Sequence, residues 1–129
     1  MTPKKVLVIE DNQQNMYLTT FILQNKGYEV IQAWDGPQGI QAAISARPDL
    51  ILLDIQLPEM DGYTVAGTLR ADLSLAVVPI VAVTSYAMAG DRERILAAGC
   101  TGYIEKPINP ETFIGQIERF MQTPLTGEG

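Results

Sequence analysis

The 129-residue chain contains no histidine, and this absence removes several classes of catalytic machinery. Ser-His-Asp and Cys-His mechanisms both need an imidazole that acts as general base. A zinc site is disfavoured as well, because Cys100 is the only cysteine and no imidazole ligand exists. Any phosphoryl chemistry on this chain must therefore use a carboxylate or a hydroxyl group.

Disulfides, membrane-spanning runs and a basic charge balance are also missing. A single cysteine cannot form an internal disulfide, which is compatible with a reducing compartment. No apolar run reaches the roughly 20 residues of a membrane span, and residues 1–5 show no signal-peptide pattern. The net charge of −6 argues against binding to phosphate backbones. We therefore expect a cytoplasmic protein that binds neither nucleic acid nor membrane.

Apolar residues, by contrast, are abundant and make up 47% of the chain. This content and this length suit one domain with a single packed core. We expect the domain to span residues 1–122 and to be followed by a flexible C-terminal tail over residues 123–129.

Short apolar runs alternate with longer amphipathic segments along the sequence. Strands are expected at residues 6–9, 28–33, 50–53, 79–83 and 102–105, and helices at 13–26, 37–46, 62–71, 92–98 and 109–121, the last beginning at Asn109 or Pro110. Ile40, Ala43 and Ile44 are expected to share the inner face of their helix. This alternation predicts an α/β fold, a doubly wound five-stranded parallel sheet with five helices on its two faces.

Polar side chains follow four of the five predicted strands. The pair Glu10 and Asp11 follows the first strand, Asp54 the third, Thr84 the fourth and Lys106 the fifth. In a parallel sheet of this kind, the ligand site lies beyond the carboxyl ends of the strands. Each residue alone has an ordinary structural explanation, as a cap or a surface side chain. Their joint occurrence at one edge of the sheet favours a functional site.

The residue types at this edge suit phosphoryl transfer. Three neighbouring carboxylates repel one another, and Mg²⁺ relieves the repulsion because it prefers oxygen ligands. Asp54 is the best nucleophile, since it ends the central apolar strand, and Glu10 and Asp11 are then the metal ligands. Lys106 adds a positive charge, and the Thr84 hydroxyl adds a hydrogen-bond donor for a transferred phosphoryl group.

These residues, in type and spacing, resemble the receiver domains of two-component response regulators. The resemblance covers essentially the whole chain and extends to residues 48–54 and 57–62. It implies a flavodoxin-like sheet with strand order 2-1-3-4-5, an order for which a chemotaxis receiver is a known example.

The resemblance also implies a role for each residue at the edge. Asp54 would accept a phosphoryl group from a histidine kinase or a histidine phosphotransfer protein. The main-chain carbonyl of Gln56 would be a further Mg²⁺ ligand beside Glu10, Asp11 and Asp54. Thr84 and Tyr103 match the switch pair of the family, and Lys106 matches its phosphate-binding lysine. The bond between Lys106 and Pro107 is commonly cis in the family.

Two segments, residues 10–16 and 84–91, narrow the resemblance to stand-alone regulators of the cell-division type, although receivers fused to hybrid histidine kinases also carry them. Glu10 stands where the family more often has Asp, and its longer arm can reach Mg²⁺ through a water molecule. We expect no effector domain and no activity beyond self-phosphorylation and slow dephosphorylation. Output would pass to a downstream protein effector or along a phosphorelay.

Two other functions on related folds fit the sequence less well. An aspartate-nucleophile phosphohydrolase of the haloacid dehalogenase kind has a second Asp as general acid two residues after the nucleophile, where this chain has Gln56. A flavodoxin-like electron carrier needs a phosphate loop rich in hydroxyl groups and glycine after the first strand. Glu10 and Asp11 occupy that loop here and would repel an FMN phosphate.

Overall fold

The computed structural model describes residues 3–57, 60–85 and 89–122. The expected tail at 123–129 and residues 58–59 and 86–88 of the motif segments lie outside these residues. In chain order the elements are β1 (Lys5–Ile9), α1 (Gln13–Asn25), β2 (Glu29–Ala33), α2 (Gly36–Ala46), β3 (Leu50–Asp54), α3 (Gly62–Ala71), the 3₁₀ helix η1 (Leu73–Leu75), β4 (Ile80–Thr84), α4 (Ala89–Ala97), β5 (Gly102–Glu105) and α5 (Phe113–Gln122). The strands are parallel in the order β2-β1-β3-β4-β5, which confirms the predicted fold.

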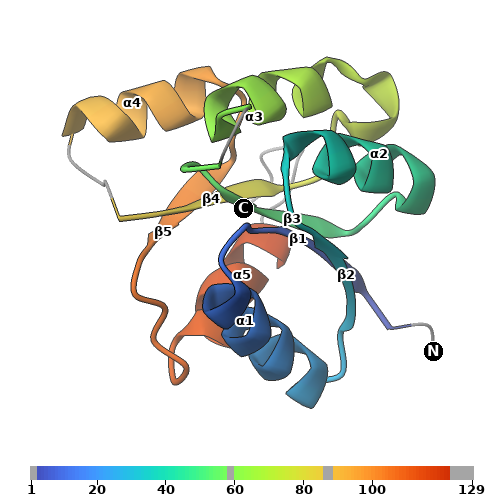
Figure 1. Cartoon of the computed structure of the whole chain (residues 1–129), viewed down its shortest axis with the longest axis vertical. Coiled ribbons are helices and arrows are strands. Elements are labelled where there is room, and N and C mark those ends of the chain that lie inside the picture. Colours follow the sequence, from blue (N-terminus) through green and yellow to red (C-terminus); the bar gives the residue numbers. More distant parts are fainter. Residues whose placement is uncertain (1–2, 58–59, 86–88, 123–129) are drawn as a thin grey trace.

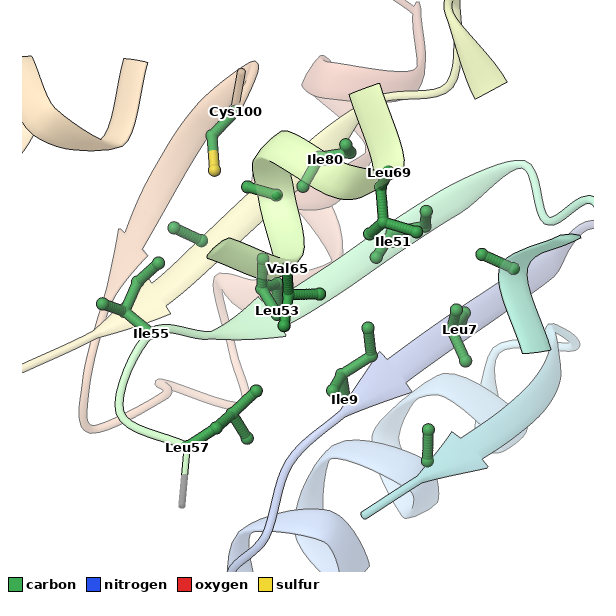
Figure 2. Packing of buried hydrophobic residues seen from close by; sticks show 14 of the residues in the cluster. Leu7, Ile9, Ile51, Leu53, Ile55, Leu57, Val65, Leu69, Ile80 and Cys100 are labelled. Atoms are coloured by element: carbon green, nitrogen blue, oxygen red, sulfur yellow. The ribbon is translucent and has the colours of Figure 1, made fainter. Parts of the chain in front are cut away.

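Helices cover both faces of the sheet, with α2, α3 and α4 on one face and α1 and α5 on the other (Figure 1). Alternate residues of each strand point to opposite faces, so Leu7 and Ile9 join the core beneath α2 and α3 while Val6 and Val8 join the core beneath α1 and α5. Figure 2 shows the first of these cores around the middle of β3. All five residues of β3 are buried, as expected for the central strand.

Polar side chains fix the first turns of the three helices that follow β1, β2 and β3. The side chains of Asn12, Asp35 and Asp61 accept hydrogen bonds from main-chain N–H groups three residues later, at 2.8–2.9 Å. Such N-caps satisfy donors that have no partner inside the helix. They make each chain segment turn back over the sheet directly after its strand ends.

The inner face of α2 differs from the prediction. Ala43 is buried, but Ile40 is only partly buried and Ile44 is 48% exposed. Gly36 and Gly39 face the core instead, and a Cβ atom at Gly39 would lie 2.4 Å from the Ile9 Cδ1 atom. The helix therefore approaches β1 through its glycines, a contact that a search for apolar periodicity does not detect.

Some element boundaries also differ from the predictions. The last helix begins at Phe113, later than expected, because Asn109 caps a turn before it: the N–H groups of Glu111 and Phe113 donate to the Asn109 side chain and carbonyl, each at 2.9 Å. Helix α4 begins three residues earlier than expected, at Ala89, and η1 was not predicted. Among the described residues, no helix combines the length and the apolarity needed to cross a membrane.

Candidate functional site

The strand register brings the predicted site residues to one edge of the sheet. Ile9 of β1 lies opposite Leu53 of β3, so the next residues, Glu10 and Asp54, emerge side by side. On the other side of β3, Thr84 ends β4 and is almost fully buried. The main-chain N–H of Glu10 is held by the carbonyl of the last residue of β2 at 3.0 Å. The site is thus built on strand ends, which are rigid supports.

Three carboxyl groups meet at this edge. Glu10, Asp11 and Asp54 each offer an oxygen atom, and these atoms lie within 4.8 Å of one another. Glu10 is 5% exposed and Asp54 is 3% exposed, whereas Asp11 is exposed. Buried carboxylates at this spacing need compensating positive charge.

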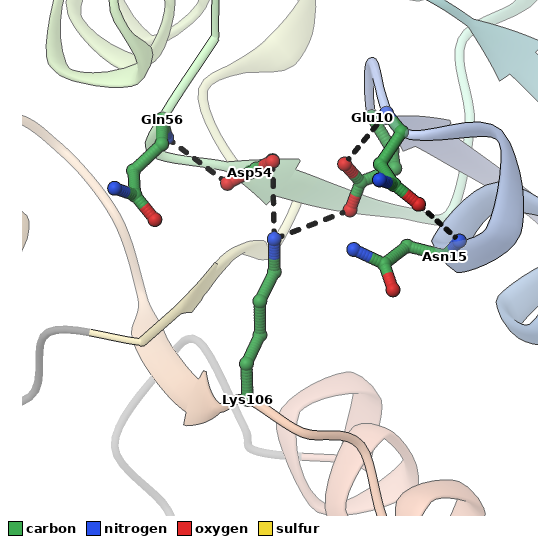
Figure 3. Close-up of polar contacts among 6 residues, drawn as sticks. Glu10, Asn15, Asp54, Gln56 and Lys106 are labelled. Carbon is green, nitrogen blue, oxygen red and sulfur yellow. Dashed lines mark hydrogen bonds and ion pairs between the residues drawn. The ribbon is translucent and has the colours of Figure 1, made fainter.

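Lys106 supplies part of that charge. Its Nζ atom lies 3.1 Å from Asp54 Oδ2 and 3.5 Å from Glu10 Oε1 (Figure 3). Its main-chain N–H donates to the Thr84 carbonyl at 2.8 Å, which ties the end of β5 to the end of β4. The peptide bond from Lys106 to Pro107 is cis, as the resemblance implied.

The ionisation of Glu10 is disfavoured in this site. Burial of the Glu10 carboxyl raises its pKa to about 7, and the hydrogen bond and negative charge of Asp54 act in the same direction. The Asn12 N–H, which donates to Glu10 at 3.1 Å, and the charge of Lys106 oppose the shift. The site therefore favours either a proton on Glu10 or an added cation. A cluster of hard oxygen ligands with this need fits Mg²⁺.

Gln56 and Tyr103 stand differently with respect to this cluster. The Gln56 N–H donates to Asp54 Oδ1 at 2.9 Å, so Gln56 borders the acceptor directly (Figure 3). Tyr103 lies on β5 opposite Ala82 and is half-buried. It stands two residues before Glu105, which is opposite Thr84. It lies outside the carboxyl cluster and lines a cavity with residues of α5.

Sequence reasoning missed the cavity beside the carboxyl cluster. This cavity, of about 270 Å³, is lined by Glu10 and Lys106 together with Asn15, Leu18, Ser85, Pro107 and Ile108. Asn15 points toward Lys106 in Figure 3. The position of Asn15 in the first turn of the helix that follows Glu10 and Asp11 was the signal that could have found this residue.

Comparisons with known proteins agree with this geometry. The response regulator receiver domain profile matches residues 6–118. The chain belongs to this family. The polar-differentiation response regulator DivK of Brucella anthropi is 44% identical over 119 residues, which cover 92% of this chain and 97% of DivK. This receiver domain is thus similar to stand-alone regulators of the kind that the sequence indicated.

Solved structures show the same similarity. The chemotaxis protein CheY4 of Vibrio cholerae has 31% identity and a TM-score of 0.89 over 92% of this chain and 99% of CheY4. The receiver domain of the Pseudomonas aeruginosa sensor histidine kinase PA1611 has 35% identity and a TM-score of 0.86 over 93% of this chain and 98% of that domain. The PA1611 domain was crystallised with a magnesium ion coordinated in its active-site cleft.

Family membership decides between the functions considered above. The protein is a signalling protein, consistent with phosphoacceptor signalling in two-component systems, and neither the phosphohydrolase nor the electron-carrier alternative is favoured. Receiver domains of response regulators interact with histidine kinases and with downstream effectors.

Proposed function

We propose that this receiver domain accepts a phosphoryl group on Asp54 from a phosphohistidine of a histidine kinase or histidine phosphotransfer protein. One observation carries the proposal: Asp54 is 3% exposed at the end of the central strand, and its Oδ2 atom lies 3.1 Å from the Lys106 ammonium. A carboxylate that is held rigidly beside a cation is positioned to attack phosphorus while the transferred oxygens are stabilised.

The other residues of the site would share the charge of the transfer. Glu10, Asp11, Asp54 and the Gln56 carbonyl would hold Mg²⁺, which neutralises charge on the phosphoryl oxygens when bound. The bond between the histidine nitrogen and phosphorus would break as the bond from Asp54 oxygen to phosphorus forms. The imidazole leaves as a neutral ring if its other nitrogen carries a proton, so no proton donor on this chain is needed. Asp54 attacks as a carboxylate, so no base is needed either.

Thr84 and Tyr103 would then report the modification. The Thr84 hydroxyl would bond a phosphoryl oxygen and draw in residues 84–91, and Tyr103 would turn toward the space that they leave. This population shift requires that phosphorylation favour one arrangement over the other. The altered face would contact a downstream protein effector, and residues 1–122 would suffice for the switch in the cytoplasm. We propose no catalysis beyond self-phosphorylation and slow dephosphorylation.

The acceptor is tested by incubation with acetyl phosphate and Mg²⁺, followed by intact-mass spectrometry. Wild type should gain one phosphoryl group and Asp54→Asn none. Asp49→Asn is a matched control, because Asp49 stands just before β3, is exposed and bonds the Lys5 N–H instead. It should be labelled like wild type. Undiminished labelling of Asp54→Asn would refute the assignment.

A further inference from the structure

Helix α4 is weakly attached to the rest of the molecule. Among its side chains that the structure describes, Ile95 alone is buried, while Arg92, Glu93, Arg94 and Leu96 are exposed. A helix with few buried apolar contacts opens at a low free energy compared with core elements. Contacts at its surface can therefore decide how firmly it is held.

One such contact joins α4 to the neighbouring helix α3. The guanidinium carbon of Arg94 lies 4.3 Å from the centroid of the Tyr63 ring. This distance is well inside the range in which an arginine is attracted to the face of an aromatic ring. Within the described part of the chain the Arg94 guanidinium makes no hydrogen bond or ion pair, so the Tyr63 ring is its principal partner.

The Tyr63 ring stands on a rigid support. The residue before it, Gly62, donates its N–H to the Ile55 carbonyl at 2.9 Å. A Cβ atom at Gly62 would lie 2.5 Å from Ile55 Cα, so the start of α3 is pressed against the chain directly after Asp54. The ring is thus fixed to the end of β3, whereas its partner Arg94 belongs to the weakly attached helix.

The turn that follows α4 is held by a different arginine. Arg70 of α3 donates from Nε to the Gly99 carbonyl at 2.9 Å, in the turn between α4 and β5. Gly99 has a φ of +112°, a conformation that glycine adopts readily. The turn after α4 is therefore anchored independently of Arg94, which lies in the last turn of the helix itself. Among the described side chains of α4, the ring contact of Arg94 is the one that joins the helix to α3 by an aromatic partner.

We propose that Tyr63 and Arg94 form a clasp that holds α4 against α3 and sets how readily α4 separates from the molecule. The inference goes beyond phosphoryl transfer and does not rest on it. Because α4 follows the segment that begins at Thr84, the clasp would oppose any displacement of that segment. The clasp is thus a conformational restraint close to the acceptor but outside its chemistry.

The test is hydrogen exchange of the α4 amides, measured by NMR on the whole chain. Arg94→Gln and Tyr63→Leu should each speed this exchange about two- to fivefold, the change expected for losing an exposed cation–π contact. Tyr63→Phe keeps the ring face and should exchange like wild type. Arg92→Gln is the charge-matched control, since Arg92 is exposed on the same helix and has no ring contact among the described residues.

Two further measurements separate the clasp from a general loss of stability. The buried β3 amides exchange only when the whole molecule unfolds. In each variant, their exchange should therefore change no more than the variant's global unfolding free energy accounts for. The double variant, Tyr63→Leu with Arg94→Gln, should show no more opening than either single variant, because both remove the same contact. Equal α4 exchange in Arg94→Gln and Arg92→Gln, or equal exchange in Tyr63→Phe and Tyr63→Leu, would overturn the proposal.

Discussion

Glu10 places a nearly fully buried carboxyl group beside Asp54, and its ionisation couples the stability of the fold to pH. Its pKa of about 7 in the folded protein compares with 4.5 for the free side chain. Between these pH values the folded state binds more protons than the unfolded state. The contribution of Glu10 to stability is therefore fully present below pH 4.5 and is lost as the pH rises to about 7.

We expect metal-free wild type to lose about 1–3 kcal/mol more unfolding free energy than Glu10→Gln between pH 4.5 and 7.5. Urea unfolding in the presence of a chelator at several pH values measures the difference. Saturating Mg²⁺ should reduce it, because a cation stabilises the ionised carboxylate. Parallel pH profiles for the two metal-free proteins would show that Glu10 is not the titrating group.

Asp11 is the exposed member of the carboxyl cluster, so its removal should affect the metal more than the fold. Mg²⁺ binds only the folded site and should raise the melting temperature of wild type. Asp11→Ala should lose this rise while keeping a similar melting temperature without metal. Glu111→Ala, which removes an exposed carboxylate from the turn before α5, serves as control in the same thermal scans. An undiminished Mg²⁺ effect in Asp11→Ala would place the metal elsewhere.

At the scale of elements, Arg70 joins α3 to two turns at the amino-terminal edge of the sheet. Besides Gly99, its guanidinium donates to the carbonyls of Leu75 at 3.0 Å and Val78 at 2.8 Å. Arg70→Met should cost about 1–3 kcal/mol of unfolding free energy, because part-buried carbonyls lose a charged donor. Labelling by acetyl phosphate should persist, since these contacts lie at the edge opposite Asp54.

Chemical denaturation measures the Arg70 effect, with Arg92→Met as the control for a surface arginine. Arg92 is exposed, and its replacement should change stability by less than about 0.5 kcal/mol. Equal losses of unfolding free energy in the two variants would mean that the hydrogen bonds from Arg70 to the carbonyls add no stability beyond the effect of removing a positive charge.

The helices show where prediction from periodicity succeeds and where it fails. Phe113 and Ile117 of α5 are four residues apart and both buried, so apolar periodicity marks the inner face of this helix. On α1, by contrast, Tyr17 and Phe21 stack on each other in solvent, 72% and 54% exposed, while Thr19 is buried. Apolarity alone does not tell a core face from an exposed aromatic face. Glycines in contact with the core, as in α2, leave no apolar signal at all.

For the molecule as a whole, the strand ends were predictable and the strand order was not. Alternating elements predicted a parallel sheet, and this placed Asp54, Thr84 and Lys106 at one edge. The order of the strands came from the family resemblance, because no local pattern encodes which strands are neighbours. Distances such as that between Lys106 and Asp54 depend on side-chain packing, which only the structure supplies. The assigned roles of these residues stay predictions.

The proposed switch can be tested at the same scale with beryllofluoride, which imitates a phosphoryl group. NMR shift changes should extend from Asp54 to residues 84–91 and to the surroundings of Tyr103. In Thr84→Ala, where the hydroxyl that would bond the new oxygens is missing, the changes should stay near Asp54. Wild-type shifts confined to the Asp54 pocket would show that the distant face does not respond.

The close approach of Gly39 to Ile9 couples the substitutions that evolution can make at two positions far apart in the sequence. An added Cβ atom at position 39 would first meet the Cδ1 methyl group of Ile9, which valine lacks. Related chains should therefore accept alanine at position 39 chiefly where position 9 is already smaller than isoleucine. The order of the two substitutions then matters. Where α2 stays packed against β1, the substitution to a smaller residue at position 9 must precede the substitution to alanine at position 39.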